Sequence, residues 1–179
     1  MRLPVVGVMG SGREAHHEFA SQVGELLAQT GVHLLTGGGA GVMAAVGQAF
    51  CQTPGRAGLS IGVLPSRSDF PSYRPKNGYP NEWVEIAIPT HLPKSGKAGM
   101  SPRSRNHINV LASDAIIMLP GSDGTLSEAR LALHYGKPII AYVGDAMPLP
   151  EDLQGIARAE RIGDVEAFLK AAIARTREG

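Results

Sequence analysis

The chain of 179 residues carries a formal net charge of +1 and has no block of lysine and arginine, which argues against nucleic-acid binding through bulk electrostatics. Its single cysteine, Cys51, excludes an intramolecular disulfide and a cysteine-based zinc cluster, and no unbroken apolar stretch approaches the 18 residues of a membrane-spanning helix. We therefore expect a soluble, cytoplasmic protein that forms one domain over residues 1–179, with no metal site, no nucleic-acid partner and no membrane association.

The first third of the chain predicts three strands and two helices. Residues 3–9 form an apolar run typical of a buried strand, and apolar side chains at 3.6-residue spacing predict a helix over residues 13–30. A second strand is expected over residues 32–36, a second helix over residues 42–52 and a third strand over residues 58–64.

The middle of the chain is less regular. Residues 65–83 are rich in Pro, Ser, Tyr and Arg and form a longer connection than the usual 2–6 residues, so we expect an irregular loop. Residues 84–88 alternate in polarity and predict a short strand near a sheet edge. A second irregular stretch is expected over residues 89–100, followed by a helix over residues 102–112.

The last third predicts a strand over residues 114–119, a helix over residues 125–135 and a strand over residues 138–143. A short segment near residues 158–162 precedes a terminal helix over residues 164–177. This alternation predicts an α/β fold, a Rossmann-like, doubly wound and mostly parallel sheet with helices on both faces.

Three glycine-rich loops each follow a predicted strand and precede a predicted helix, at residues 10–12, 37–41 and 121–124. The carboxyl ends of parallel strands share one edge of the sheet, where ligands bind, and glycine allows backbone N–H groups to approach an anion closely. An NAD-binding module is a weaker alternative, because the first loop lacks the third glycine of the dinucleotide fingerprint. We predict that the loops bind a phosphate group through Gly10, Ser11, Gly12, Gly37, Gly38, Gly39, Gly41, Gly121, Ser122, Asp123, Gly124 and Thr125.

Glu128 has two interpretations from the residues alone. A carboxylate just behind a glycine loop is a candidate catalyst, but Thr125-x-x-Glu128 also matches a capping box, in which the carboxylate folds back onto the Thr125 N–H. The pattern Ser11-x-x-Glu14 is a second capping-box match. Asp123 would repel a phosphate, so we expect it to point away or to bind a ribose hydroxyl or a cation.

The segments 37–43 and 120–128, together with Arg105, resemble the LOG family, formerly named lysine decarboxylase-like, and the related molybdenum-cofactor carrier proteins. The similarity covers most of residues 3–143, and the Glu128 motif is similar to the family signature P-G-G-x-G-T-x-x-E. The run over residues 104–110 and the short first glycine loop are more similar to the carrier branch.

For a LOG enzyme, the resemblance implies hydrolysis of the N-glycosidic bond of a cytokinin-type nucleoside 5′-monophosphate, with release of the base and ribose 5-phosphate and no cofactor. Glu128 and Arg105 would be the catalytic residues, Glu128 activating water and Arg105 orienting the ligand, and Asn106 would contact the ligand. For the carrier branch, the resemblance implies that the same loops hold the molybdenum cofactor, a pterin phosphate, without cleaving it. Both branches imply a homodimer or homotetramer, with the helix over residues 102–112 as the expected interface.

Overall fold

The computed structural model describes residues 2–67 and 74–178, with side chains described up to residue 174. Its seven strands form one sheet in the order β4-β3-β2-β1-β5-β6-β7, and all neighbouring pairs are parallel. The strands are β1 (Val5–Met9), β2 (His33–Thr36), β3 (Ser60–Leu64), β4 (Ile86–Pro89), β5 (Ala115–Met118), β6 (Ile139–Ala141) and β7 (Ala157–Arg158).

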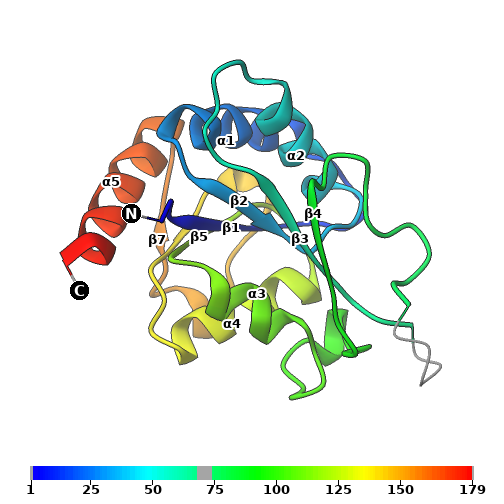
Figure 1. Cartoon of the computed structure of the whole chain (residues 1–179). Helices are drawn as coiled ribbons and strands as arrows, with labels where there is room; N and C mark the ends of the chain where they lie inside the picture. Colours follow the sequence, from blue (N-terminus) through cyan, green and yellow to red (C-terminus); the bar gives the residue numbers. More distant parts are fainter. Residues whose placement is uncertain (1, 68–73, 179) are drawn as a thin grey trace.

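Helices cover both faces of the sheet, as Figure 1 shows: α1, α2 and α5 lie on one face, and α3 and α4 lie on the other. The predicted α/β, Rossmann-like, doubly wound fold is confirmed. None of the described helices combines the length and apolar composition needed to cross a membrane. The helices are α1 (His17–Thr30), α2 (Val42–Gln52), α3 (Asn106–Ala112), α4 (Asp123–His134) and α5 (Ile162–Glu178), and the short 3₁₀ turns are η1 (Gly96–Ala98), η2 (Gly144–Ala146) and η3 (Glu151–Leu153).

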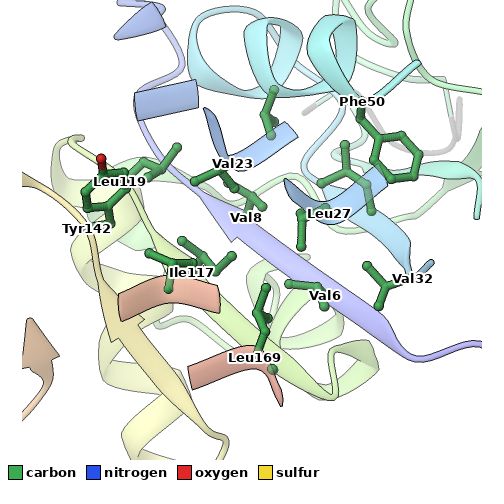
Figure 2. Close-up of a cluster of buried hydrophobic side chains, with 14 of the residues drawn as sticks. Val6, Val8, Val23, Leu27, Val32, Phe50, Ile117, Leu119, Tyr142 and Leu169 are labelled. Atoms are coloured by element: carbon green, nitrogen blue, oxygen red, sulfur yellow. The ribbon is translucent and has the colours of Figure 1, made fainter. Parts of the chain in front are cut away.

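The central strands supply side chains to two cores, because successive strand residues point to opposite faces. Val6, Val8 and Ile117 pack beneath α1, α2 and α5, as Figure 2 shows. Ile116 and Met118 of β5 belong to the core beneath α3 and α4. A strand that is buried on both faces reads as an unbroken apolar run, which is why β1 and β5 are recognisable from sequence.

The strand order reverses direction at the centre of the sheet, and this reversal positions the site. From β1 the chain runs outward through β2 and β3 to β4, and it then returns to the other side of β1 as β5. The loop after β1 leads to α1 on one face, whereas the loop after β5 leads to α4 on the opposite face (Figure 1). Such a switch point leaves a crevice at the carboxyl ends of the strands.

Helix α1 begins at His17 rather than at residue 13. Ser11 Oγ accepts hydrogen bonds from the backbone N–H groups of Arg13 (3.1 Å) and Glu14 (3.0 Å), which closes a turn. This turn does not continue into the helix, because His16 precedes α1 in a left-handed conformation with φ of 42°. The interpretation of Ser11-x-x-Glu14 as the capping box of this helix is therefore wrong.

Helix α4 begins at Asp123 rather than at Thr125. Its N-cap is Ser122, whose carbonyl oxygen accepts a helical hydrogen bond from the Leu126 N–H at 3.0 Å. Glu128 therefore lies in the second turn of the helix, beyond the N3 position that a capping box requires. The capping-box interpretation of Glu128 is wrong, and its carboxylate contacts Arg105, just before α3, and Asn109 within α3 instead.

The helix predicted over residues 102–112 is shorter and begins at Asn106. The residues before it form a turn in which the Ser104 N–H donates to the Ser101 carbonyl oxygen at 2.8 Å. Arg105 is consequently the N-cap of α3, at the point where the chain enters the helix.

Candidate functional site

A cleft of about 870 Å³ opens at the carboxyl ends of β1 and β5. It lies at the switch point of the strand order, where ligands bind in open α/β sheets. Three of the predicted site residues, Gly38, Gly39 and Gly41, are absent from its described lining. The others all line it, namely Gly10, Ser11, Gly12, Gly37, Arg105, Asn106, Gly121, Ser122, Asp123, Gly124, Thr125 and Glu128.

Ser11 joins the three glycine loops to one another. Its N–H donates to the carbonyl oxygen of Pro120 at 2.9 Å, and its carbonyl oxygen accepts a hydrogen bond from the N–H of Val42, the first residue of α2, at 2.8 Å. Gly121 passes close to the same residue, because a Cβ there would lie 2.9 Å from the Ser11 nitrogen. The loops after β1 and β5 and the start of α2 are therefore held as one unit.

The glycines outside the lining have a different role within the second loop. The carbonyl oxygen of Gly38 accepts a hydrogen bond from the Asn81 N–H at 2.8 Å, and that of Gly39 accepts one from Asn81 Nδ2 at 2.7 Å. Gly41 adopts φ of 64° and packs against the backbone of residues 11–13. These residues attach the loop to neighbouring segments, whereas Gly37 faces the cleft.

Arg105 is a buried cation at the floor of the cleft, with an exposed fraction of 5%. Its guanidinium packs directly against the backbone of Gly37, where a Cβ would lie 2.6 Å from Cζ. Its Nη1 lies 3.4 Å from Glu128 Oε1, and its buried Nε has no hydrogen-bond partner among the described residues. The positive charge of Arg105 is therefore weakly compensated within the described chain.

Glu128 is a buried carboxyl group beside Arg105, with an exposed fraction of 7%. Burial raises its pKa, and this effect outweighs the opposing influence of the Arg105 charge and of the hydrogen bond from Asn109 Nδ2, which is 2.7 Å long. A carboxyl group that keeps its proton above its usual range can act as a general acid, or bind a ligand as a neutral donor.

Asn109 does not line the cleft, but it supports Glu128 from behind and was missed by the sequence analysis. It is buried and donates to Glu128 from α3, four residues after Arg105. Because helical residues four positions apart lie on the same face, the spacing of Arg105 and Asn109 is a signal that could have identified it.

Lys76 is a second cation near the floor of the cleft, and it was also missed. Its Nζ donates to Ser95 Oγ at 3.2 Å, and Ser95 itself lines the cleft. Burial lowers the pKa of Lys76, and the positive charge of Arg105 lowers it further. Two cations therefore share this region. Lys76 belongs to a stretch of the sequence, residues 65–83, in which no periodic pattern marks individual positions.

The rim of the cleft carries several charged residues at its entrance. Asp123 is exposed at the first turn of α4, and Glu14 Oε2 lies 3.4 Å from His16 Nε2. Arg13 and Lys97 also line the cleft. Across residues 2–67 and 74–178, no group of three or more His, Cys, Asp or Glu side chains is arranged to hold a metal ion.

Comparison with known protein families matches residues 3–166 to the SLOG cluster4 family. The chain belongs to this family. An uncharacterized protein of Archaeoglobus fulgidus is 33% identical to this SLOG cluster4 chain over 141 residues, which cover 78% of this chain and 80% of the relative. The predicted resemblance to the LOG and molybdenum-cofactor carrier superfamily is confirmed.

Two solved structures resemble this SLOG cluster4 protein over nearly its whole length. The molybdenum cofactor binding protein of the phototrophic bacterium Rippkaea orientalis is 35% identical, with a TM-score of 0.76 over 97% of this chain and 99% of its own. The molybdenum cofactor carrier protein of Chlamydomonas reinhardtii is 27% identical, with a TM-score of 0.71 over the same shares of the two chains. This chain therefore shares its fold with proteins that are described as binding or carrying the molybdenum cofactor.

Proposed function

We propose that this protein binds a phosphorylated pterin, the molybdenum cofactor, as cargo and does not cleave it. The proposal rests on the surroundings of Arg105. Its buried guanidinium has one contact, of 3.4 Å, with the carboxyl group of Glu128, whose pKa is raised. A buried charge with so little compensation favours an anionic partner, and arginine binds phosphate through paired hydrogen bonds. The names of the Rippkaea and Chlamydomonas proteins support a pterin as the rest of the ligand.

The glycine loops fit the phosphate half of such a ligand. The start of α4 presents Gly124 and Thr125 to the cleft, and the positive end of a helix dipole attracts anions. The cleft volume of about 870 Å³ lies within the range of roughly 300–1,000 Å³ that is usual for small-molecule sites. No cleavage step is required of these residues in a carrier.

A second function, N-glycosidic hydrolysis of a nucleoside 5′-monophosphate, is favoured by Glu128. Its raised pKa suits a residue that gives a proton to the leaving base, and Asn109 holds the carboxyl group in a fixed position beside Arg105. In this reaction the bond from the base nitrogen to C1′ breaks, and water supplies the hydroxyl group of ribose 5-phosphate and the proton that the base retains.

Two measurements on the wild-type protein separate these functions. Calorimetric titration with a pterin phosphate measures binding, and chromatography of a panel of nucleoside 5′-monophosphates after incubation measures release of the base. The carrier proposal predicts binding of the pterin phosphate and no released base. If a nucleotide in the panel is hydrolysed in a reaction that the Glu128→Gln variant no longer supports, the hydrolase is correct and the carrier proposal is overturned.

We also propose that the protein forms a homodimer or homotetramer through α3 and α4. The two helices cover one face of the sheet, and they leave Leu111 and Leu133 exposed at 49% and 45%. Light scattering of the wild type should report an oligomer that the Leu111→Glu variant dissociates. Leu59→Glu changes an exposed leucine outside these helices and is the matched control. A monomeric wild type at micromolar concentration would contradict this proposal.

A further inference from the structure

Tyr79 is the only phenylalanine, tyrosine or tryptophan among the described residues that line the cleft. The side chain is half-buried, and its hydroxyl group forms no hydrogen bond within residues 2–67 and 74–178. An aromatic ring at the wall of a polar cleft offers a surface on which a flat ligand can stack. The glycine loops and Arg105 would bind a phosphate group without the Tyr79 ring, so the ring is available for another part of a ligand.

The chain around Tyr79 is fixed to the second glycine loop. Asn81 donates from its N–H to the carbonyl oxygen of Gly38 (2.8 Å) and from Nδ2 to that of Gly39 (2.7 Å). Its Oδ1 accepts a hydrogen bond from the Trp83 N–H at 2.9 Å. These bonds hold the Tyr79 segment against the loop, so the position of the ring is set before a ligand arrives.

The ring itself rests on a glycine. A Cβ at Gly39 would lie 2.9 Å from Cε1 and Cζ of Tyr79 and 2.8 Å from Cε of Met43, so only glycine leaves room for this contact. Met43 also lines the cleft, and a thioether beside an aromatic ring makes a favourable contact. Gly39 thus contributes to the cleft by seating Tyr79, although Gly39 does not line it.

Tyr79 also lies close to the cationic part of the cleft. Its N–H donates to the carbonyl oxygen of Lys76 at 3.1 Å, and the Lys76 ammonium group reaches Ser95, a lining residue. One short turn therefore carries both an aromatic ring and a positive charge that lies near Arg105. This pairing suits a single ligand that joins a flat ring to an anionic group.

We propose that Tyr79 is the residue on which the planar nitrogen heterocycle of the ligand stacks, while the glycine loops and Arg105 hold its phosphate. This inference rests on the proposed function and adds the residue that recognises the ring. Stacking depends on the π-face and tolerates different heterocycles, so the same ring accepts a pterin or a purine. Tyr79 therefore contributes affinity for the ring system, and other contacts must discriminate between the two.

The test compares Tyr79→Ala and Tyr79→Phe with the wild type by calorimetric titration. The three probes are 6-hydroxymethylpterin phosphate, AMP and methyl phosphate, which has no ring. We expect Tyr79→Ala to weaken binding of a ring-bearing probe by about 5- to 150-fold, as for other aromatic platforms, and to leave methyl phosphate binding unchanged. Tyr79→Phe keeps the π-face and should bind as the wild type does. A ring-bearing probe that binds the wild type and Tyr79→Ala equally well does not stack on this ring, and this result for both ring-bearing probes would overturn the proposal.

The outcomes distinguish this inference from the function on which it rests. If the wild type binds none of the three probes, the proposed function fails and the stacking role fails with it. If the wild type binds them and Tyr79→Ala weakens methyl phosphate as much as the ring-bearing probes, Tyr79 only supports the loop. If Tyr79→Phe is as weak as Tyr79→Ala, recognition depends on the hydroxyl group, and stacking is wrong.

Discussion

At the scale of single residues, the contact between Arg105 and Glu128 brings together a buried guanidinium group and a buried carboxyl group. Burial raises the pKa of Glu128 and favours the neutral form of this carboxyl group, which lies beside the Arg105 guanidinium. The contact of 3.4 Å between Arg105 Nη1 and Glu128 Oε1 is longer than the 2.7–2.9 Å of a strong charge-assisted hydrogen bond. The pair is therefore poorly suited to stabilising the fold and well suited to receiving a third group.

The first prediction concerns the pH dependence of stability through Glu128. Below about pH 4 the Glu128 carboxyl group is protonated in both the folded and the unfolded chain. As pH rises above this value, the unfolded chain releases the proton at a lower pH than the folded chain does. The folded wild type binds more protons in this window, so its free energy of unfolding falls relative to that of Glu128→Gln as pH rises through the raised pKa. Urea unfolding between pH 4 and 8 measures this difference. A difference that stays constant with pH would show that the pKa of Glu128 is not raised.

The second prediction uses the contact between Gly37 and Arg105. A Cβ at residue 37 would overlap the guanidinium, so Gly37→Ala must displace Arg105 from the floor of the cleft. We expect this variant to lose phosphate affinity by about tenfold or more, since a charge-assisted hydrogen bond is worth roughly 1.5–3 kcal/mol. The control is Gly155→Ala, where a Cβ meets no atom within 4 Å. Phosphate affinity equal to that of the control would mean that Arg105 does not bind the phosphate.

At the scale of elements, the close crossing of α1 and α2 depends on Gly24. A Cβ there would lie 2.6 Å from the carbonyl oxygen of Val46, 2.7 Å from Cβ of Ala49 and 2.9 Å from the nitrogen of Phe50. Because Gly24 has no side chain and Ala49 has a small one, the backbones of the two helices come into direct contact. This contact holds α2 against the sheet beside the second glycine loop.

The third prediction is that Gly24→Ala destabilises the protein by about 1–3 kcal/mol, the usual cost of overpacking, although alanine is the better helix former. Gly163→Ala is the matched helical control, because a Cβ at that position in α5 meets no atom within 4 Å. The control should gain up to about 1 kcal/mol from helix propensity. Equal effects of the two substitutions in thermal unfolding would refute the packing explanation.

The first residue of several helices could not be predicted from the sequence patterns. Sequence patterns identified α1, α3 and α4 as helices, but each begins at a residue that local hydrogen bonding decides. His16 ends the turn before α1 in a left-handed conformation, and Ser122 rather than Thr125 caps α4. Moving the N-cap by three residues, from Thr125 to Ser122, takes Glu128 out of the N3 position of a capping box and leaves it facing Arg105, so its role could not be derived from spacing alone.

At the scale of the whole molecule, the parallel sheet and the meeting of the glycine loops at one edge of it were predictable, because buried strands and glycine loops have strong local signatures. Gly37, Arg105 and Glu128 meet in one cleft although they come from three separate segments. Tyr79 and Lys76 were not predictable, because their positions depend on contacts of the loop with Gly39 and Ser95. Sequence patterns predict the regular helices and strands, whereas the part of the site that would bind the heterocycle is positioned by tertiary contacts.

The central claim, that the cleft carries a phosphorylated pterin as cargo, is tested most directly by loading. Molybdenum cofactor released from a molybdenum enzyme is mixed anaerobically with the protein, which is then reisolated by gel filtration and analysed for molybdenum and pterin. The proposal predicts that the wild type retains both in equal amounts and that Arg105→Gln, which removes the buried cation, retains neither. A wild-type protein that emerges from the column without molybdenum and without pterin would contradict it.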